Sequence, residues 1–218
     1  MIEAKLNELK KRLMNEAGLS EEMVRRAIKG LTEKKKIDLE RVIKEYEPQM
    51  NKSEVELDEL CTNFIALYQP EAGNLRTVLM ILRINNDLER IGDLAVNISE
   101  SALFLIERPF VKPLIDLPRM AEEAIKMLKD AVDSFINKDV RLAKAVCERD
   151  VIVDGLRDQI FRELIAYMRS DASTIERSLH LIRIARCLER IGDLSTNVCE
   201  DVIFIVEGKI IKHRNDND

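Results

Sequence analysis

Two acidic side chains, one helical turn apart, occur twice in this sequence with identical neighbours. Glu89 and Asp93 belong to the heptapeptide Leu-Glu-Arg-Ile-Gly-Asp-Leu that begins at Leu88, and Glu189 and Asp193 belong to the same heptapeptide 100 residues later. Residues i and i+4 of a helix lie on one face, so their oxygens can bind one cation together or bridge two. This spacing alone is common in helical proteins, but its duplication within identical segments indicates a repeated acidic site.

The match extends well beyond the heptapeptide. Between residues 78–108 and 178–208, 14 of 31 aligned positions are identical without a gap, so the chain contains two copies of one module. Apolar agreement is expected of two equivalent core-facing helices, whereas a solvated face usually drifts between Glu, Lys, Gln and Ser. Polar residues that are identical in both halves therefore indicate that the two halves share a function. These positions are Arg83/Arg183, Glu89/Glu189, Arg90/Arg190, Asp93/Asp193, Asn97/Asn197, Glu100/Glu200 and Glu107/Glu207.

A second acidic stripe precedes each heptapeptide. In the first half, four oxygen-bearing side chains fall close to one line of a helix at about 100° per residue, namely Glu47, Asn51, Glu54 and Asp58. In the second half, Asp150 and Asp154 take the places of Glu47 and Asn51 at an offset of 103. If the two helices of each half pack antiparallel, their oxygens converge. Convergent carboxylates repel one another unless a proton or a polyvalent cation neutralises them.

The acidic residues therefore predict bound divalent or trivalent metal ions. Oxygen ligands favour hard ions, and iron, zinc, manganese and magnesium all stay open because carboxylates do not select among them. The competing interpretation is that both stripes are simply solvated helix faces. Gly92 and Gly192 lie in the middle of the expected helices, where each costs about 1 kcal/mol relative to alanine. They predict either close approach of a neighbouring helix or ordinary tight packing.

Composition limits the class of protein. Of the 218 residues, 46% are apolar and 34% are charged, with seven Gly and no Trp, and apolar spacings of three, four and seven predict an all-α fold. The formal charge of −5 disfavours nucleic acid and anionic membrane as partners, since both attract basic surfaces. Neither a secretory signal nor an apolar run of about 20 residues is found. We expect a cytoplasmic protein with reduced thiols, because no Cys-x-x-Cys pair occurs among Cys61, Cys147, Cys187 and Cys199.

Helix signals divide the chain into two halves. Residues 1–108 and 119–218 flank a linker at 109–118 that contains three prolines. Ser20, followed by two glutamates, is typical of an N-cap. Short connections between long helices favour antiparallel neighbours, which predicts two tandem, pseudo-symmetric three-helix bundles. The expected helices span about 2–16, 20–34, 38–67, 74–106, 119–137, 140–169 and 173–207.

Catalytic alternatives find little support in the residues. A ferritin-like di-metal oxidase needs Glu-x-x-His pairs, but His180 and His213 follow Arg177 and Ile210 at that spacing. No cysteine has a credible general base and no glycine-rich phosphate loop is present, which argues against nucleophilic catalysis, an ATPase and a kinase. Two non-enzymatic interpretations stay open: a metal-binding protein, and a metal-free helical scaffold that binds partners through its surfaces.

At these residues the sequence resembles the PhoU family, regulators of phosphate uptake. The resemblance covers essentially the whole chain: both heptapeptides, the turn at residues 66–70 (Ala-Leu-Tyr-Gln-Pro), and the segment from Asp150 to Asp154. It implies two three-helix bundles that carry metal clusters on Glu/Asp-x-x-x-Asp motifs at their surfaces. Carried over residue by residue, the implied metal ligands are Glu89 with Asp93, Glu189 with Asp193, Asp150 with Asp154, and Glu47 with Asn51.

The resemblance also implies a function and partners. Members of the family are non-enzymatic negative regulators that couple a phosphate ABC transporter to a phosphate-sensing histidine kinase. The implied partners are the ATPase subunit of the transporter and the sensor kinase, with membrane contact only through them, and we expect a homodimer. The chain departs from the family pattern at Pro48, which should kink or restart its helix, and at Asn51, an uncharged ligand. We therefore expect the first-half cluster to bind metal less tightly.

Overall fold

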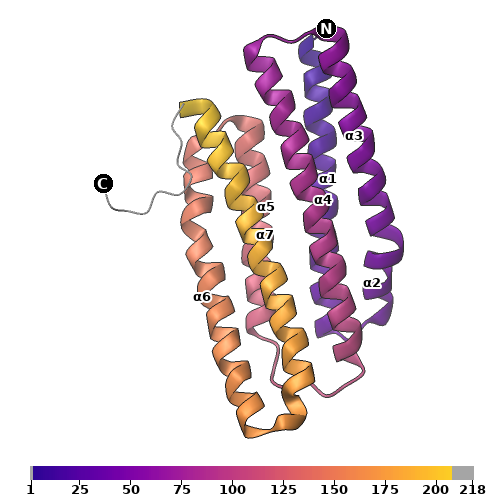
Figure 1. Ribbon diagram of the computed structural model, residues 1–218, viewed down its shortest axis with the longest axis vertical. Helices are drawn as coiled ribbons and strands as arrows, with labels where there is room; N and C mark the ends of the chain where they lie inside the picture. The colour runs from indigo at the N-terminus through magenta and orange to yellow at the C-terminus, as the bar shows by residue number, and fades with distance from the viewer. Residues whose placement is uncertain (1, 208–218) are drawn as a thin grey trace.

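Helices account for all the regular structure in the computed structural model, which describes residues 2–207 of the chain. No strand occurs within that range, and the all-α prediction is confirmed. None of the helices in the same range is both long and apolar enough to cross a membrane. In chain order the elements of Figure 1 are α1 (Ile2–Thr32), α2 (Lys36–Arg41), the π-helical turn η1 (Val42–Tyr46), α3 (Glu47–Tyr68), α4 (Ala72–Ile106), α5 (Asp116–Asn137), α6 (Val140–Ser170), the 3-10 turn η2 (Ala172–Thr174) and α7 (Ile175–Glu207).

The long helices form two three-helix bundles that stand side by side in Figure 1, with α1, α3 and α4 in one and α5, α6 and α7 in the other. In the first bundle α1 runs parallel to α4, as two contacts in the same chain order show. Ser20 Oγ donates to the Leu88 carbonyl (3.3 Å), and Lys34 Nζ donates to the Arg108 carbonyl (3.2 Å). The predicted pair of pseudo-symmetric bundles is confirmed. Their apolar side chains join into one continuous core, and the domain boundary placed at 109–118 stays a prediction.

The first helix is longer than the sequence suggested. We expected a break near Gly18 with Ser20 as an N-cap, but α1 runs through both residues without interruption, so that prediction is wrong. The buried stripe of α1 continues on both sides of the glycine, for example at Leu13 and Met23, and its burial holds the helix together there. Ser20 is itself buried and donates its hydroxyl to the Glu16 carbonyl, one turn back along the same helix (3.0 Å).

A π-helical turn lies just before Pro48. α2, η1 and α3 follow one another without a break, and η1 ends at Tyr46. Pro48 has no N–H, so the carbonyl of Lys44 cannot receive the usual α-helical bond from it. The wider π turn accommodates this loss, and the N–H of Glu47 bonds to the carbonyl of Val42. The kink expected at the proline is therefore a π-bulge, and it sets the position of Glu47.

The second bundle begins earlier than expected. α5 starts at Asp116 rather than at Arg119, because Pro118 occupies the first helical turn, where a missing N–H has no intrahelical partner to lose. α6 starts where the sequence predicted. The Asp139 carboxylate caps it by accepting bonds from the two N–H groups that follow (2.9 and 3.1 Å).

The two bundles meet along α4 and α7, which pack antiparallel, and along α1 and α5. Arg83 of α4 pairs with Asp201 of α7. Farther along α4, Arg183 of α7 donates to Asn97 and to Glu100 (3.3 Å). Because Arg83 and Arg183 are equivalent residues of the two repeats, part of the repeated polar set holds the bundles together instead of facing a ligand.

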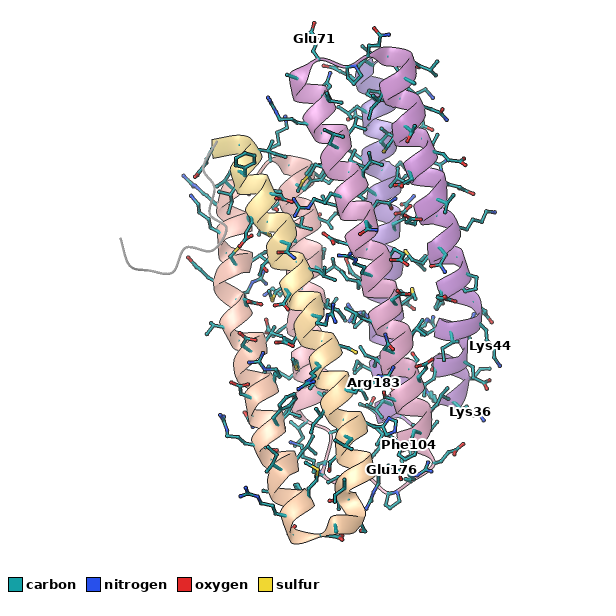
Figure 2. All side chains as sticks on the ribbon, viewed as in Figure 1. Lys36, Lys44, Glu71, Phe104, Glu176 and Arg183 are labelled. Atoms are coloured by element: carbon teal, nitrogen blue, oxygen red, sulfur yellow. The ribbon has the colours of Figure 1, made fainter. Side chains whose placement is uncertain are left out.

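His180 also packs at this seam. Its ring stacks on Phe104, with the ring centroids 4.0 Å apart and the planes at 18°. Phe104 and Arg183 are both labelled beside the seam in Figure 2. His180 is thus a packing residue, and His213 lies outside the described residues. All four cysteines are free thiols, three of them buried and Cys147 partly exposed.

We predict that Gly18→Ala stabilises the protein by about 0.5–1 kcal/mol, because alanine restricts the unfolded chain and nothing lies within 4 Å of the position its Cβ would take. Urea unfolding followed by circular dichroism measures the change. Gly30→Ala is the matched control in the same helix and should destabilise, since its Cβ would lie 2.5 Å from Leu39 Cδ2. A loss of stability in Gly18→Ala would show that α1 is interrupted at this point.

Candidate metal-binding faces

The acidic pairs of α6 and α7 lie on one face of the second bundle. Asp150 of α6 reaches α7 beside Gly192, where its Oδ1 is 3.3 Å from the position of an added Cβ. Two turns farther along α6, Arg157 pairs with Glu189 of α7. We call this surface the second acidic face, and it contains the four predicted ligands Asp150, Asp154, Glu189 and Asp193.

Like charges within the second acidic face disfavour its ionised state. Burial is the largest cause that raises the pKa of Asp150 to about 6, and the neighbouring charge of Asp154 comes next. Asp193 and Glu189 add to this effect. The pKa of Asp193 is raised in the same way, first by burial and then by Glu189 and Asp154. The carboxylates of the two helices are therefore close enough to repel one another, as the sequence predicted for antiparallel packing.

Arg157 supplies a positive charge to this face. Its guanidinium pairs with Asp154 (2.9 Å), with Asp158 (2.9 Å) and with Glu189, so it joins one acid of α7 to two acids of its own helix. It also opposes the rise in the pKa of Asp150. The protein thus carries its own partial counter-charge here. A metal ion on this face would compete with Arg157 for Asp154 and Glu189.

The first bundle has an equivalent surface on α3 and α4. Burial is the largest cause that raises the pKa of Glu89, followed by Asp93 and Glu54, while Arg90 opposes them and Glu47 adds a smaller effect. We call this surface the first acidic face, and it contains the four predicted ligands Glu47, Asn51, Glu89 and Asp93. The amide Nδ2 of Asn51 donates to the carboxylate of Glu47 (3.2 Å).

Equivalent contacts at the two glycines match the offset of 103 that the sequence predicted between α3 and α6. Met50 Cγ lies 3.2 Å from an added Cβ at Gly92, and Val153 Cγ1 lies 3.6 Å from one at Gly192. The predicted close approach at both glycines is therefore confirmed. At this offset Glu54 of α3 takes the place of Arg157 of α6.

The positions of Glu54 and Arg157 weigh against the expectation that the first face binds metal less tightly. Asn51 and Pro48 still weaken the ligand set of the first face. However, the second face is partly neutralised by Arg157, whereas Glu54 adds a negative charge to the first. The order of the two affinities stays a prediction to be tested.

The chemistry of the donors fits a hard cation on both faces, because each offers carboxylate oxygens from two adjacent helices. As they stand, however, no three His, Cys, Asp or Glu side chains within residues 2–207 are grouped so that they could hold a metal ion. Binding would therefore require rotamer changes. On the second face these changes would separate Arg157 from Asp154 and Glu189.

Arg157 was missed by the sequence reasoning, although a signal for it existed. It follows Asp154 by three residues, a spacing at which opposite charges pair on a helix. The repeat identifies Arg83 and Arg183 as equivalent residues but does not show that both join the two bundles. Periodicity shows which residues share a helix face but not which two faces meet.

Fold and site together define a class of protein: a pair of three-helix bundles, each with an acidic face built on two adjacent helices. The family profile of the PhoU domain matches the chain twice, at residues 13–102 and 117–202. The chain belongs to the PhoU family.

Relatives and solved structures agree with this membership. The chain is 40% identical to the phosphate-specific transport system accessory protein PhoU homolog of Aquifex aeolicus, over 96% of this chain and 95% of that protein. It is 33% identical to the phosphate-specific transport system accessory protein PhoU of Escherichia coli K12, over 96% and 87%. The crystal structure of PhoU from Pseudomonas aeruginosa matches with a TM-score of 0.90 at 33% identity, covering 96% of this chain and 100% of that one.

We predict that, without metal, Asp150→Asn stabilises the protein at pH 7 by about 1 kcal/mol, a figure that allows for solvent screening. The pKa of Asp150 is raised above its unfolded value, so the folded state loses stability as pH rises from about 4 to about 6. Asparagine removes that loss, and the gain should shrink at pH 4. Urea unfolding in EDTA at both pH values measures it.

Glu148→Gln, an exposed change on the same helix, is the control and should have little effect at either pH. An Asp150→Asn variant that is less stable at pH 7, or equally altered at both pH values, would contradict the crowding of carboxylates on this face.

Proposed function

We propose that this chain is a non-enzymatic, metal-binding negative regulator of phosphate uptake, which couples a phosphate ABC transporter to a phosphate-sensing histidine kinase. The observation that carries the proposal is the pair of equivalent acidic faces, one on each bundle. Relatives that cover nearly the whole chain bear the name phosphate-specific transport system accessory protein, which supports a role in regulating phosphate transport. The coupling to a kinase follows from the family resemblance.

Metal ions would be held by the acidic pairs of adjacent helices, with Glu89 and Asp93 facing Glu47 and Asn51 in the first bundle. In the second bundle the ligands are Asp150, Asp154, Glu189 and Asp193. A bound divalent or trivalent ion would supply positive charge that stabilises the ionised carboxylates of Glu89 and Asp150, which burial and then neighbouring acids disfavour. Iron, zinc, manganese and magnesium all suit these oxygen donors.

The proposed partners are the ATPase subunit of the transporter and the sensor kinase, met in the cytoplasm. Two similar bundles in one chain present the same kind of surface twice. Repeated surfaces suit symmetric partners, such as a kinase dimer or a pair of ATPase subunits, and a homodimer of this chain would double them again. The membrane is reached only through these partners.

A metal-free helical scaffold is the second candidate, and one observation favours it. Arg157 already pairs with carboxylates of both helices on the second face, so that face has a counter-charge without metal. In this alternative the acidic faces are docking surfaces for basic partners.

We predict that protein purified without a histidine tag binds metal on both faces, and that Asp93→Asn combined with Asp193→Asn lowers its metal content after chelation and reloading. Elemental analysis gives the content. Because metal binds the folded state, it should also raise stability by about 2.7 kcal/mol at a hundredfold excess over Kd. The paired change Glu122→Gln with Glu123→Gln on α5 is the control. Unchanged metal content in the Asp93/Asp193 variant would remove this site assignment.

We also predict that a host cell without this gene expresses its phosphate-starvation genes in phosphate-rich medium and accumulates excess phosphate. The physical reason is the loss of a restraint on both kinase signalling and transport. Reporter expression and cell phosphate are the measurements, with the intact gene restored as control. If both are unchanged and the purified protein binds neither partner, the regulatory function is wrong.

A further inference from the structure

A buried carboxyl group of the first bundle is not among the predicted ligands of the acidic faces. Glu16 of α1 is only 5% exposed, and its Oε2 has no hydrogen-bond partner in the protein. Glu54 and Asp58 of α3 act on it as nearby negative charges. A buried carboxylate oxygen without a partner is strongly unfavourable, and native structures usually provide one.

A second buried oxygen without a partner belongs to a residue that contacts Asp58. Asn85 of α4 is fully buried, and its Nδ2 donates to Asp58 Oδ1 (3.0 Å) and to the Glu54 carbonyl (2.9 Å). These bonds place the amide against the acids of α3. Its Oδ1 has no partner in the protein. An amide oxygen is a normal ligand for hard cations.

A proton alone does not give the unpartnered oxygens of Glu16 and Asn85 a partner. Burial, and then Glu54 and Asp58, raise the pKa of Glu16 to about 8, with Glu56 adding to the effect and Arg12 opposing it. Protonation at neutral pH, which this pKa favours, removes the charge of Glu16 but leaves Glu16 Oε2 and Asn85 Oδ1 without a partner. A divalent cation would offset two charges and give a partner to the amide oxygen of Asn85 as well.

A cavity brings water to the edge of Glu16, but neither Asp58 nor Asn85 lines it. Glu16 borders a cavity of about 120 Å³ between α1 and α3. A volume of this size holds several water molecules, because one needs roughly 10–15 Å³. The remaining lining residues are Arg12, Asn15, Leu19, Gln49 and Ser53.

The second bundle shows that the fold does not require polar residues here. Met23 and Met127 contact the equivalent glycines of the two bundles, which sets an offset of 104 between α1 and α5. Met120 then takes the place of Glu16. Ala185 takes the place of Asn85. Both replacements are buried and apolar, so the packing of the fold does not itself require Glu16 and Asn85 to be polar.

We propose that Glu16, Asp58 and Asn85 form an interior site for a partly hydrated divalent cation of the Mg²⁺ and Mn²⁺ class, between α1, α3 and α4. Two carboxylates, one amide oxygen and water make a hard donor set, which these ions prefer. The site goes beyond the proposed function, because it uses none of the predicted ligands of the acidic faces. Glu54 is a nearby negative charge for both Glu16 and Glu89, so it links the two sets of residues electrostatically.

Mn²⁺ binding to the full chain, followed by electron paramagnetic resonance and calorimetry, tests the interior site. The background variant carries Glu89→Gln, Asp93→Asn, Glu189→Gln and Asp193→Asn, which remove ligands from both acidic faces. We expect it to retain one Mn²⁺ per chain, and we expect adding Glu16→Gln to weaken that binding at least tenfold. Asn85→Ala, which copies the second bundle, should weaken it as well.

Glu21→Gln is the matched control. Glu21 lies on the same helix and its pKa is also raised by burial, but its charged neighbours include Lys129 of α5. This change should leave Mn²⁺ binding intact. Circular dichroism confirms that each variant is folded, and Mn²⁺ should raise Tm in the background variant but not after Glu16→Gln.

The outcomes separate this site from the acidic faces. Loss of all Mn²⁺ in the background variant overturns the interior site and supports metal on the faces. Equal binding by the wild type and the background variant, abolished by Glu16→Gln, supports the interior site and counts against the faces. Binding that Glu16→Gln leaves unchanged in the background variant overturns the inference.

Discussion

The close approach of two helices at a glycine is the constraint on which each bundle depends. Met50 packs against Gly92 in the first bundle, and Asp150 and Val153 pack against Gly192 in the second. A Cβ at either glycine would lie 3.2–3.3 Å from a side-chain atom of the neighbouring helix, so those side chains would have to shift by a few tenths of an ångström. The same approach brings the acids of one helix beside those of the next. The cost of a glycine in mid-helix and the repulsion between acids therefore share one geometric origin.

Apolar packing, rather than charge pairing, holds those acids together. A continuous core of buried aliphatic side chains runs through both bundles and fixes the helix positions. The acidic side chains lie at the edge of this core, where burial raises the pKa of Glu89, Asp150 and Asp193. Such a site is electrostatically unfavourable without a cation, which is the condition under which a metal or a basic partner gains affinity from charge.

The two repeats differ in the charged and polar side chains at equivalent positions. The second bundle places Arg157 among its acids, whereas the first places Glu54 at the equivalent position and adds the buried pair of Glu16 and Asn85. The apolar framework is shared, and Met23 and Met127 keep the same contact in both bundles. The two bundles thus share an apolar core but carry different polar side chains, so we expect them to bind different ligands.

Much of this architecture was decided by the sequence alone. The identical heptapeptides established the repeat, helical periodicity predicted the all-α fold and the bundles, and the i, i+4 spacing placed each acidic pair, such as Glu89 and Asp93, on one face. Tertiary structure decided which faces meet. The Arg83 seam, the guanidinium of Arg157 between two helices and the burial of Glu16 depend on contacts between residues distant in the chain. Tertiary burial also overrode the local break signal at Gly18, because the apolar stripe of α1 continues through it.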